Sequence, residues 1–183
     1  IGSSLARSIR RGELAEKLIL CDQDQTILDE AKSLDLADQY ETNAKLAVPD
    51  ADLVVYAIPV GAIGTVGELV SDSLKQGSII SDVGSVKNTV LKALRPSIPD
   101  GVHLVPGHPV AGTEQSGPSA GFASLFDDRW CILTPDVGTD DAAVQKMEDL
   151  WRAIGSRVEI MNAEHHDLVL AITSHVPHLI AYN

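Results

Sequence analysis

The stretch Leu18-Ile19-Leu20-Cys21-Asp22 carries the strongest indication of the fold. An uncharged apolar run that ends at a carboxylate is typical of a buried parallel strand with an acid at its carboxyl-terminal tip. Residues 1–10, which precede it, carry Leu5 and Ile9 four positions apart, as one face of a helix does. Gly12 is placed to end that helix in a left-handed conformation. A helix that leads into a buried strand predicts an α/β protein.

Strand-like and helical segments alternate along the rest of the chain. Runs typical of strands follow at residues 51–57, 78–82, 103–105, 129–134 and 157–161. Helical periodicity covers residues 25–36, 60–74, 87–94, 140–154 and 163–183, the last with a kink where Pro177 removes a backbone donor. Strands that alternate with helices imply a doubly wound, mostly parallel sheet.

Gly2 and Asp22 have the spacing of a dinucleotide-binding motif. Roughly 20 residues separate the last glycine of that fingerprint from the acid that binds the adenosine ribose. The helix that starts at Gly2 and Ser3 would hold a pyrophosphate on its N–H groups, and Asp22 would accept from the ribose 2′-hydroxyl. Gln23 follows instead of a basic residue, which favours NAD over NADP. The alternative is a glycine at a helix start and a solvated aspartate at a strand end.

The end of the strand-like run at residues 51–57 is also expected to lie beside the dinucleotide. Pro59 stops the run at 51–57 and lets the backbone approach a ligand, so Ile58 and Pro59 are predicted cofactor contacts. Only one of the three fingerprint glycines is present. We therefore expect the chain to be truncated at its N-terminus, without the first strand and the leading glycines.

The composition excludes several classes of partner. The 183 residues carry a formal net charge of −12, which argues against nucleic acid because such partners need a basic footprint. The same charge argues against an anionic membrane surface. The longest uncharged run, residues 53–67, is too short to span a membrane, and there is no signal peptide pattern. A chain of this length predicts one domain with the beginning of a second.

The two cysteines, Cys21 and Cys131, both lie in strand-like apolar runs. They are predicted to be buried small hydrophobic residues, since no disulfide framework or cysteine metal site is visible. A cytoplasmic location is the simplest expectation.

Catalytic groups are expected beyond the carboxyl ends of the strands, where ligands bind in open α/β sheets. The segment 108–114 (His-Pro-Val-Ala-Gly-Thr-Glu) places an imidazole, a hydroxyl and a carboxylate on one loop. His108 is the predicted general base, because an imidazole can take a proton at neutral pH. The alternative is a histidine that only hydrogen-bonds the loop. Ser85, after Gly84 at a strand tip, could hold a substrate oxygen or cap the helix that starts at Val86 or Lys87.

The remaining histidines are given other roles. They are His103, His165, His166, His175 and His178. No His-Glu-x-x-His arrangement is present and cysteine ligands are absent, so no metal is predicted. His165 and His166 are expected to be exposed or capping residues beside Glu164, and His103 to be structural. No Gly-x-Ser-x-Gly elbow is present, so the sequence does not support nucleophilic hydrolysis.

Three motifs stand out: Gly84-Ser85-Val86-Lys87, the segment 108–114, and Ser174-His175-Val176-Pro177-His178. Together they resemble the prephenate/arogenate dehydrogenase family of tyrosine biosynthesis. The resemblance implies a Rossmann-type NAD(P)-binding domain over residues 1–162. It also implies that residues 163–183 begin an all-helical dimerisation domain, so that the parent protein is a homodimer.

The resemblance also implies a reaction. Prephenate or arogenate is decarboxylated oxidatively: a hydride passes from the carbon that bears the ring hydroxyl to nicotinamide, carbon dioxide leaves, and the ring becomes aromatic. His108 would accept the hydroxyl proton, and Ser85 would bind the same oxygen and lie beside the cofactor. Thr113 and Glu114 would shape the substrate pocket, and His175 would line it.

The family pattern extends beyond this chain. Its first strand and most of its helical domain, with a substrate-binding arginine, have no counterpart here, so we expect little dehydrogenase activity from these residues alone. In the strand order 3-2-1-4-5-6 the first strand is central. The strands at 18–21 and 53–57 would then face a gap of about 10 Å, or collapse onto each other.

Two other functions stay open at this point. A β-hydroxyacid dehydrogenase shares the architecture but would use a lysine on the long helix, and residues 163–183 contain none. A non-catalytic NAD-binding module would need no convergence of Ser85, His108 and His175. Placing these three side chains in space discriminates between catalysis and binding alone.

Overall fold

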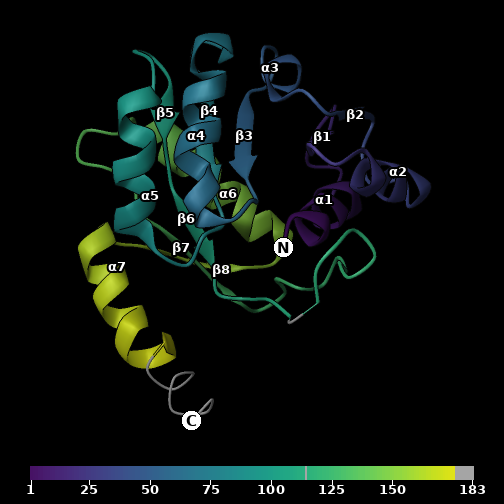
Figure 1. Cartoon of the computed structure of the whole chain (residues 1–183). Coiled ribbons are helices and arrows are strands. Elements are labelled where there is room, and N and C mark those ends of the chain that lie inside the picture. Colours follow the sequence, from purple (N-terminus) through teal and green to yellow (C-terminus); the bar gives the residue numbers. More distant parts are fainter. Residues whose placement is uncertain (114, 176–183) are drawn as a thin grey trace.

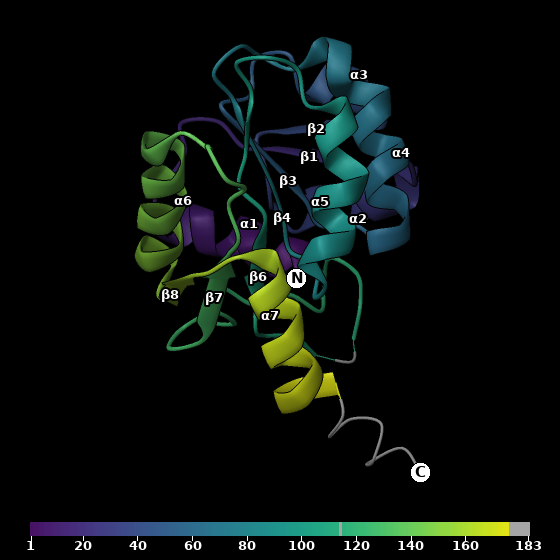
Figure 2. The ribbon, with the colours of Figure 1, turned by 90° about the vertical axis from the view of Figure 1, so that its left-hand side faces the viewer.

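The computed structural model describes residues 1–113 and 115–175, without the side chains of Ser174 and His175. Its layers are those of an α/β protein. Helices α4 (Val60–Val70) and α5 (Lys87–Leu94) lie on one side of the strands, and α6 (Asp141–Ile154) lies on the other (Figures 1 and 2). The predicted doubly wound arrangement is confirmed.

The other elements complete the order along the chain. The strands are β1 (Ile19–Cys21), β2 (Gln39–Glu41), β3 (Leu53–Tyr56), β4 (Ile79–Asp82), β5 (His103–Leu104), β6 (Gly107–Pro109), β7 (Trp130–Leu133) and β8 (Arg157–Ile160). The remaining helices are α1 (Gly2–Arg11), α2 (Gln25–Ser33), α3 (Ala44–Ala47) and α7 (Ala163–Leu170). Short 3₁₀ turns follow α4 (Ser71–Ser73) and α5 (Arg95–Ser97), and a π-helical turn, Ala171–His175, follows α7.

The pairing is mostly parallel, as predicted. β1 pairs with β2, β3 with β4, β4 with β5, and β7 with β8, all in parallel. β6 is antiparallel to β7, with His108 opposite Ile132. The prediction that His108 lies on a loop is wrong, because the Gly- and Pro-containing stretch hid a short strand that is held at its end by the Val110 N–H on the carbonyl of Trp130.

Strands β1 and β3 do not pair with each other. Among the described strands β1 is hydrogen-bonded to β2 alone, while β3 joins β4 and β5. The two ladders have not collapsed onto one another. Of the two outcomes expected for these strands, the structure therefore shows the open one.

Two apolar clusters hold the layers together. On one side, α1 and α6 pack on the strands through residues such as Leu5, Met147 and Trp151. The Trp151 ring meets Phe126 edge to face, with centroids 5.3 Å apart. On the other side, Ile63 of α4 and Val90 and Leu94 of α5 pack on Ile80 of β4, and all four are completely buried. Because both faces of β4 are covered, its carboxyl end is fixed in position.

Several local predictions are wrong. Gly12 follows α1 with φ −92°, so the left-handed residue is Glu13, with φ 51°. Cys21 is exposed, because it ends a three-residue strand that is paired on one side, whereas Cys131 is buried as expected. α4 ends before residue 74 because its last turn tightens to 3₁₀, and α2 ends at Ser33. The segments β2 and α3 were not predicted.

The C-terminal helix is described only in part. α7 and its π-helical turn cover residues 163–175, and the predicted kink at Pro177 lies outside the described residues. In Figure 1, α7 lies toward the same end of the molecule as the carboxyl end of β3 and the start of α1. None of the helices described is long and apolar enough to cross a bilayer.

Candidate active site

A buried ion pair organises the end of β4. Asp82 and Lys87 are both fully buried, with Lys87 Nζ 2.5 Å from Asp82 Oδ2. The carboxylate also accepts the Gly84 N–H at 2.7 Å and the Gly107 N–H at 3.3 Å. Lys87 Nζ donates in addition to the Gly107 carbonyl at 2.6 Å. The pair therefore joins the loop after β4 to the first residue of β6.

Electrostatics and burial oppose each other in this pair. Burial raises the pKa of Asp82 and lowers the pKa of Lys87, while the charge of each partner and their hydrogen bond favour the ionised forms. Two backbone N–H groups on the same carboxylate compensate for part of the lost hydration. We call the Asp82–Lys87 ion pair, with its hydrogen bonds to Gly84 and Gly107, the bracket, because it holds these two backbone segments together.

Ser85 and His108 are each one residue away from this bracket. Ser85 follows Gly84 and is exposed, and His108 follows Gly107 and is only 8% exposed. Since Gly84 and Gly107 bind the same Asp82 carboxylate, the structure brings the two predicted catalytic residues to one end of the sheet. Convergence of the Ser85, His108 and His175 side chains on one substrate stays a prediction.

His108 contacts a residue that sequence reasoning placed elsewhere. Its Nδ1 lies 2.8 Å from Nε2 of His166, and the two rings meet at 68°. His166 is completely buried, and its Nδ1 lies 2.8 Å from Asp167 Oδ1. The prediction that His166 is exposed or capping is wrong, because α7 turns His166 inward with Ala163 and Leu170. The spacing of Ala163, His166 and Leu170, which places them on one face of a helix, is the feature of the sequence that could have indicated a buried His166.

His165, the preceding residue, points the other way. Its side chain is exposed, as predicted, and its backbone N–H is capped by Asn162 at 2.8 Å. His103, predicted to be structural, is half-buried in β5, where it pairs with Ile79. Neither histidine contributes to the chain of contacts around His108.

Asp167 caps α5 from a distant part of the sequence. It accepts the Lys87 N–H at 2.8 Å and the Asn88 N–H at 3.0 Å. Burial opposes its ionisation, but these two hydrogen bonds and that from His166 outweigh it and lower the pKa of Asp167. The alternative role of Ser85 as the cap of α5 is therefore wrong: the N-cap position is Val86, and the capping side chain comes from α7.

The predicted cofactor residues lie at the ends of α1, β1 and β3. A side chain on Gly2 would put a Cβ 3.0 Å from Ala57 Cβ, so glycine lets α1 approach the chain just after β3. Asp22 is half-buried directly after β1, and its Oδ1 accepts the Asp24 N–H at 2.9 Å. Pro59 is the N-cap residue of α4, and Ile58 is half-buried before it.

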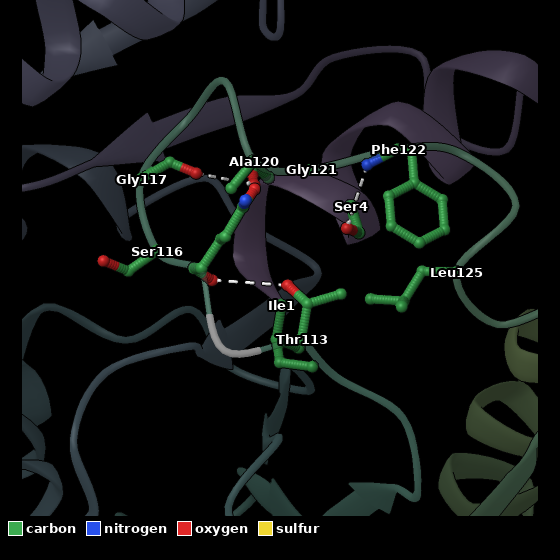
Figure 3. Close-up of a pocket in the computed structure, with 11 residues that line it drawn as sticks. Ile1, Ser4, Thr113, Ser116, Gly117, Ala120, Gly121, Phe122 and Leu125 are labelled. Atoms are coloured by element: carbon green, nitrogen blue, oxygen red, sulfur yellow. Dashed lines mark hydrogen bonds between the residues drawn. The ribbon is translucent and has the colours of Figure 1, made fainter.

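A small pocket separates the first turn of α1 from the loop after β6 (Figure 3). Ile1, Ser3 and Ser4 line it together with Thr113, which lies next to Ile1 in Figure 3. The loop is tied to the helix, because Ser3 Oγ donates to the Gly117 carbonyl at 3.2 Å and the Phe122 N–H donates to Ser4 Oγ. Thr113, a predicted substrate residue, thus lies beside the predicted cofactor end of α1.

Two predicted site residues are not placed. Glu114 lies outside the described residues. The backbone of His175 belongs to the π-helical turn after α7, but its side chain is likewise outside the description. Within residues 1–113 and 115–175 no group of three or more His, Cys, Asp or Glu side chains is arranged to hold a metal ion.

Comparison with known proteins places the chain in a family. Residues 5–160 match the model of the prephenate dehydrogenase nucleotide-binding domain. The chain is 46% identical over 182 residues to the cyclohexadienyl dehydrogenase of Zymomonas mobilis, covering 100% of this chain and 62% of the relative. It is 31% identical to the prephenate dehydrogenase of Bacillus subtilis, covering 99% of this chain and 49% of that relative.

Solved structures agree with the sequence matches. The prephenate dehydrogenase of Aquifex aeolicus, in complex with hydroxyphenyl propionate and NAD⁺, superposes with a TM-score of 0.91 at 30% identity, covering 99% of this chain and 63% of that chain. The arogenate dehydrogenase of Synechocystis gives 0.88 at 26% identity, covering 96% and 61%. The chain spans about half to two thirds of these relatives. This chain belongs to the prephenate dehydrogenase family, and residues 5–160 are its nucleotide-binding domain.

Proposed function

We propose that the whole protein catalyses the NAD-dependent oxidative decarboxylation of prephenate or arogenate, which yields 4-hydroxyphenylpyruvate or tyrosine. The observation that carries the proposal is the placement of His108. It is a buried imidazole, hydrogen-bonded through one nitrogen to His166 and bracketed to the Ser85 loop by Asp82. Relatives named for this chemistry support it, among them a structure that holds NAD⁺ and a hydroxyphenyl ligand.

The residues at the ends of α1 and β1 fit a dinucleotide. No side chain caps the first turn of α1, and the Gly2 contact with Ala57 would make a Cβ at this position a tight fit. Gly2 and Ser3 would hold the pyrophosphate, and the Asp22 carboxylate would accept from the adenosine ribose. Ile58, Pro59 and Ser85 would flank the nicotinamide half, which accepts a hydride when NAD is bound.

His108 and Ser85 would act on the ring hydroxyl. His108 accepts the hydroxyl proton as the hydride leaves the same carbon, so positive charge develops on the imidazole and not in the ring. Ser85 hydrogen-bonds the same oxygen and keeps it within reach of His108. Loss of carbon dioxide then makes the ring aromatic, which drives the step, and the phenolate oxygen takes the proton back from the His108 imidazolium. Thr113, Glu114 and His175 are proposed substrate contacts.

Residues beyond the nucleotide-binding domain complete the proposed enzyme. We assign residues 1–162 to the dinucleotide domain and residues 163–183 to the start of a helical dimerisation domain. Leu168 and Ile172, four positions apart, are 61% and 64% exposed and form an apolar stripe that such a domain would cover. A homodimer in the cytoplasm is the assembly that we propose.

A steady-state assay of the whole protein tests the function. Prephenate and arogenate are each supplied with NAD⁺ and with NADP⁺, and formation of reduced cofactor is followed together with release of carbon dioxide. We expect turnover with NAD⁺ and at least one of the two substrates. Binding of NAD⁺ without turnover of either substrate would favour the non-catalytic alternative.

A further inference from the structure

His108, His166 and Asp167 form a linear chain of hydrogen bonds between β6 and α7. His108 Nδ1 lies 2.8 Å from His166 Nε2, and His166 Nδ1 lies 2.8 Å from Asp167 Oδ1. His166, the middle member, is fully buried. Each histidine nitrogen in these contacts must either donate or accept a hydrogen bond. The positions of the protons therefore follow once the role of one end of this series, Asp167, is known.

Asp167 fixes the direction of the chain. Its two carboxylate oxygens already accept the backbone N–H groups of Lys87 and Asn88, which can only donate. An ionised carboxylate has no proton to give. His166 Nδ1 must therefore carry a proton and donate it to Asp167 Oδ1.

The charge state of His166 decides the next contact. Burial lowers the pKa of His166, and the Lys87 cation acts in the same direction, while Asp167 and Asp82 oppose it. The buried thiol of Cys131 on β7 also faces this cluster, and burial raises its pKa, so it stays neutral. A neutral His166 that is protonated on Nδ1 has a lone pair on Nε2. That lone pair can only accept, so His108 Nδ1 must be the donor.

We propose that His166 and Asp167 are positioning residues that hold His108 in the tautomer with the proton on Nδ1, which leaves Nε2 as the proton acceptor. The catalytic meaning of this assignment rests on the proposed function. When the substrate hydroxyl gives its proton, its O–H bond breaks and a new bond forms at His108 Nε2. The imidazolium then donates from Nδ1 to His166, and Asp167 stabilises the positive charge through the chain.

The same carboxylate also holds the helix that follows the Ser85 loop. Asp167 binds the first N–H groups of α5, whose Lys87 side chain in turn binds Asp82 and Gly107. One residue of α7 thus fixes both the tautomer of the base and the helix behind the serine. Docking of α7 onto α5 is then a condition for a competent site.

Nitrogen NMR of the imidazoles tests the proposal directly. Long-range ¹H–¹⁵N correlation spectra of the ¹⁵N-labelled protein at pH 7.5 distinguish a protonated from an unprotonated ring nitrogen. We expect protonated Nδ1 and unprotonated Nε2 for both His108 and His166. A proton on His108 Nε2 instead, or protons on both nitrogens of His166, would overturn the assignment. This readout needs no variant and no turnover.

Variants of the whole protein test the consequence. His166→Phe removes the acceptor, and we expect kcat to fall by about 10²-fold with little change in KM and a mixed His108 tautomer in the spectra. His166→Gln keeps an acceptor oxygen and should recover a large part of kcat. His165→Gln, an exposed neighbour on the same helix, should match the wild type. Equal kcat in the His166→Phe variant and the wild type would contradict the positioning role.

The two proposals can fail separately. The expected proton positions together with no turnover of prephenate or arogenate by the wild type would overturn the proposed function and leave the tautomer assignment intact. Turnover by the wild type together with a proton on His108 Nε2 in place of Nδ1 would overturn the tautomer assignment and leave the proposed function intact.

Discussion

Asp82 and Lys87 form a fully buried ion pair that joins two loops of the candidate active site. The carboxylate holds Gly84 and Gly107, and the ammonium holds the Gly107 carbonyl. Neither group reaches solvent, so neither can exchange its partner for water. The positions of Ser85 and His108, each one residue further along, depend on this pair.

Removal of one partner of this pair should be strongly destabilising. We expect Lys87→Met to lower the free energy of unfolding by about 3–5 kcal/mol, because it leaves the Asp82 carboxylate buried without its cation. Denaturant unfolding followed by circular dichroism measures this. Lys75→Met removes a lysine from the exposed pair with Asp52 and serves as the matched control, with little change expected. Equal losses of unfolding free energy in Lys87→Met and Lys75→Met would contradict the structural role of the buried ion pair.

The stability should fall in acid through His166. Its folded-state pKa is lowered mainly by burial, so the folded protein favours the neutral ring. This contribution is present above the unfolded-state pKa and is lost as the pH falls through that value and toward the folded one. We expect the unfolding free energy of the wild type to fall more steeply below about pH 6.5 than that of His166→Gln. His165→Gln should keep the wild-type slope, and a wild-type slope in His166→Gln as well would show that His166 does not titrate on unfolding.

Gly2 should be required for cofactor binding because of its contact with Ala57. A Cβ at Gly2 would lie 3.0 Å from Ala57 Cβ, and a valine adds methyl groups that must push α1 away. We expect Gly2→Val to weaken NAD⁺ binding at least about 10-fold and to cost roughly 1–3 kcal/mol of stability. Fluorescence titration with NAD⁺ and thermal unfolding measure the two effects. Gly61→Ala is the control, since nothing lies within 4 Å of its Cβ; unchanged NAD⁺ affinity in Gly2→Val would refute the role of this contact.

Asp22 should set the preference between the two nicotinamide cofactors. We expect Asp22→Ala to weaken NAD⁺ binding by roughly 10–100-fold, the value of a hydrogen bond to a charged group, and to affect NADP⁺ much less. Asp24→Ala removes the neighbouring carboxylate that caps α2. It should lower stability without changing the ratio of the two affinities. If both variants shifted that ratio alike, Asp22 would not be the ribose ligand.

The sequence predicts the elements whose signal is local. Residues 87–94 form α5 with the expected ends, and the apolar runs of β3, β4 and β7 are strands within two residues of prediction. Their periodicity depends only on neighbouring residues, so it can be recognised without tertiary contacts. β2 and β6 were missed because short, polar or Gly- and Pro-containing stretches become strands only through their partners.

The site was predictable in its motifs but not in its connections. His108 and Ser85 follow recognisable strand ends. His166, by contrast, is 58 positions from the ring that it contacts, and Asp167 caps a helix 80 positions away. The spacing of residues along a helix indicates from sequence alone which of them share an inward face, as it does for Ala163, His166 and Leu170. It does not show which buried group they meet.

The kinetics of His108→Asn test the central claim most directly. Asparagine keeps a polar side chain of similar reach but cannot take the substrate proton at neutral pH. We predict that kcat of the whole protein falls by about 10²–10⁴-fold while the dissociation constant for NAD⁺ stays near that of the wild type. Turnover at the wild-type rate, or loss of NAD⁺ binding in place of turnover, would contradict the assignment of His108 as the base.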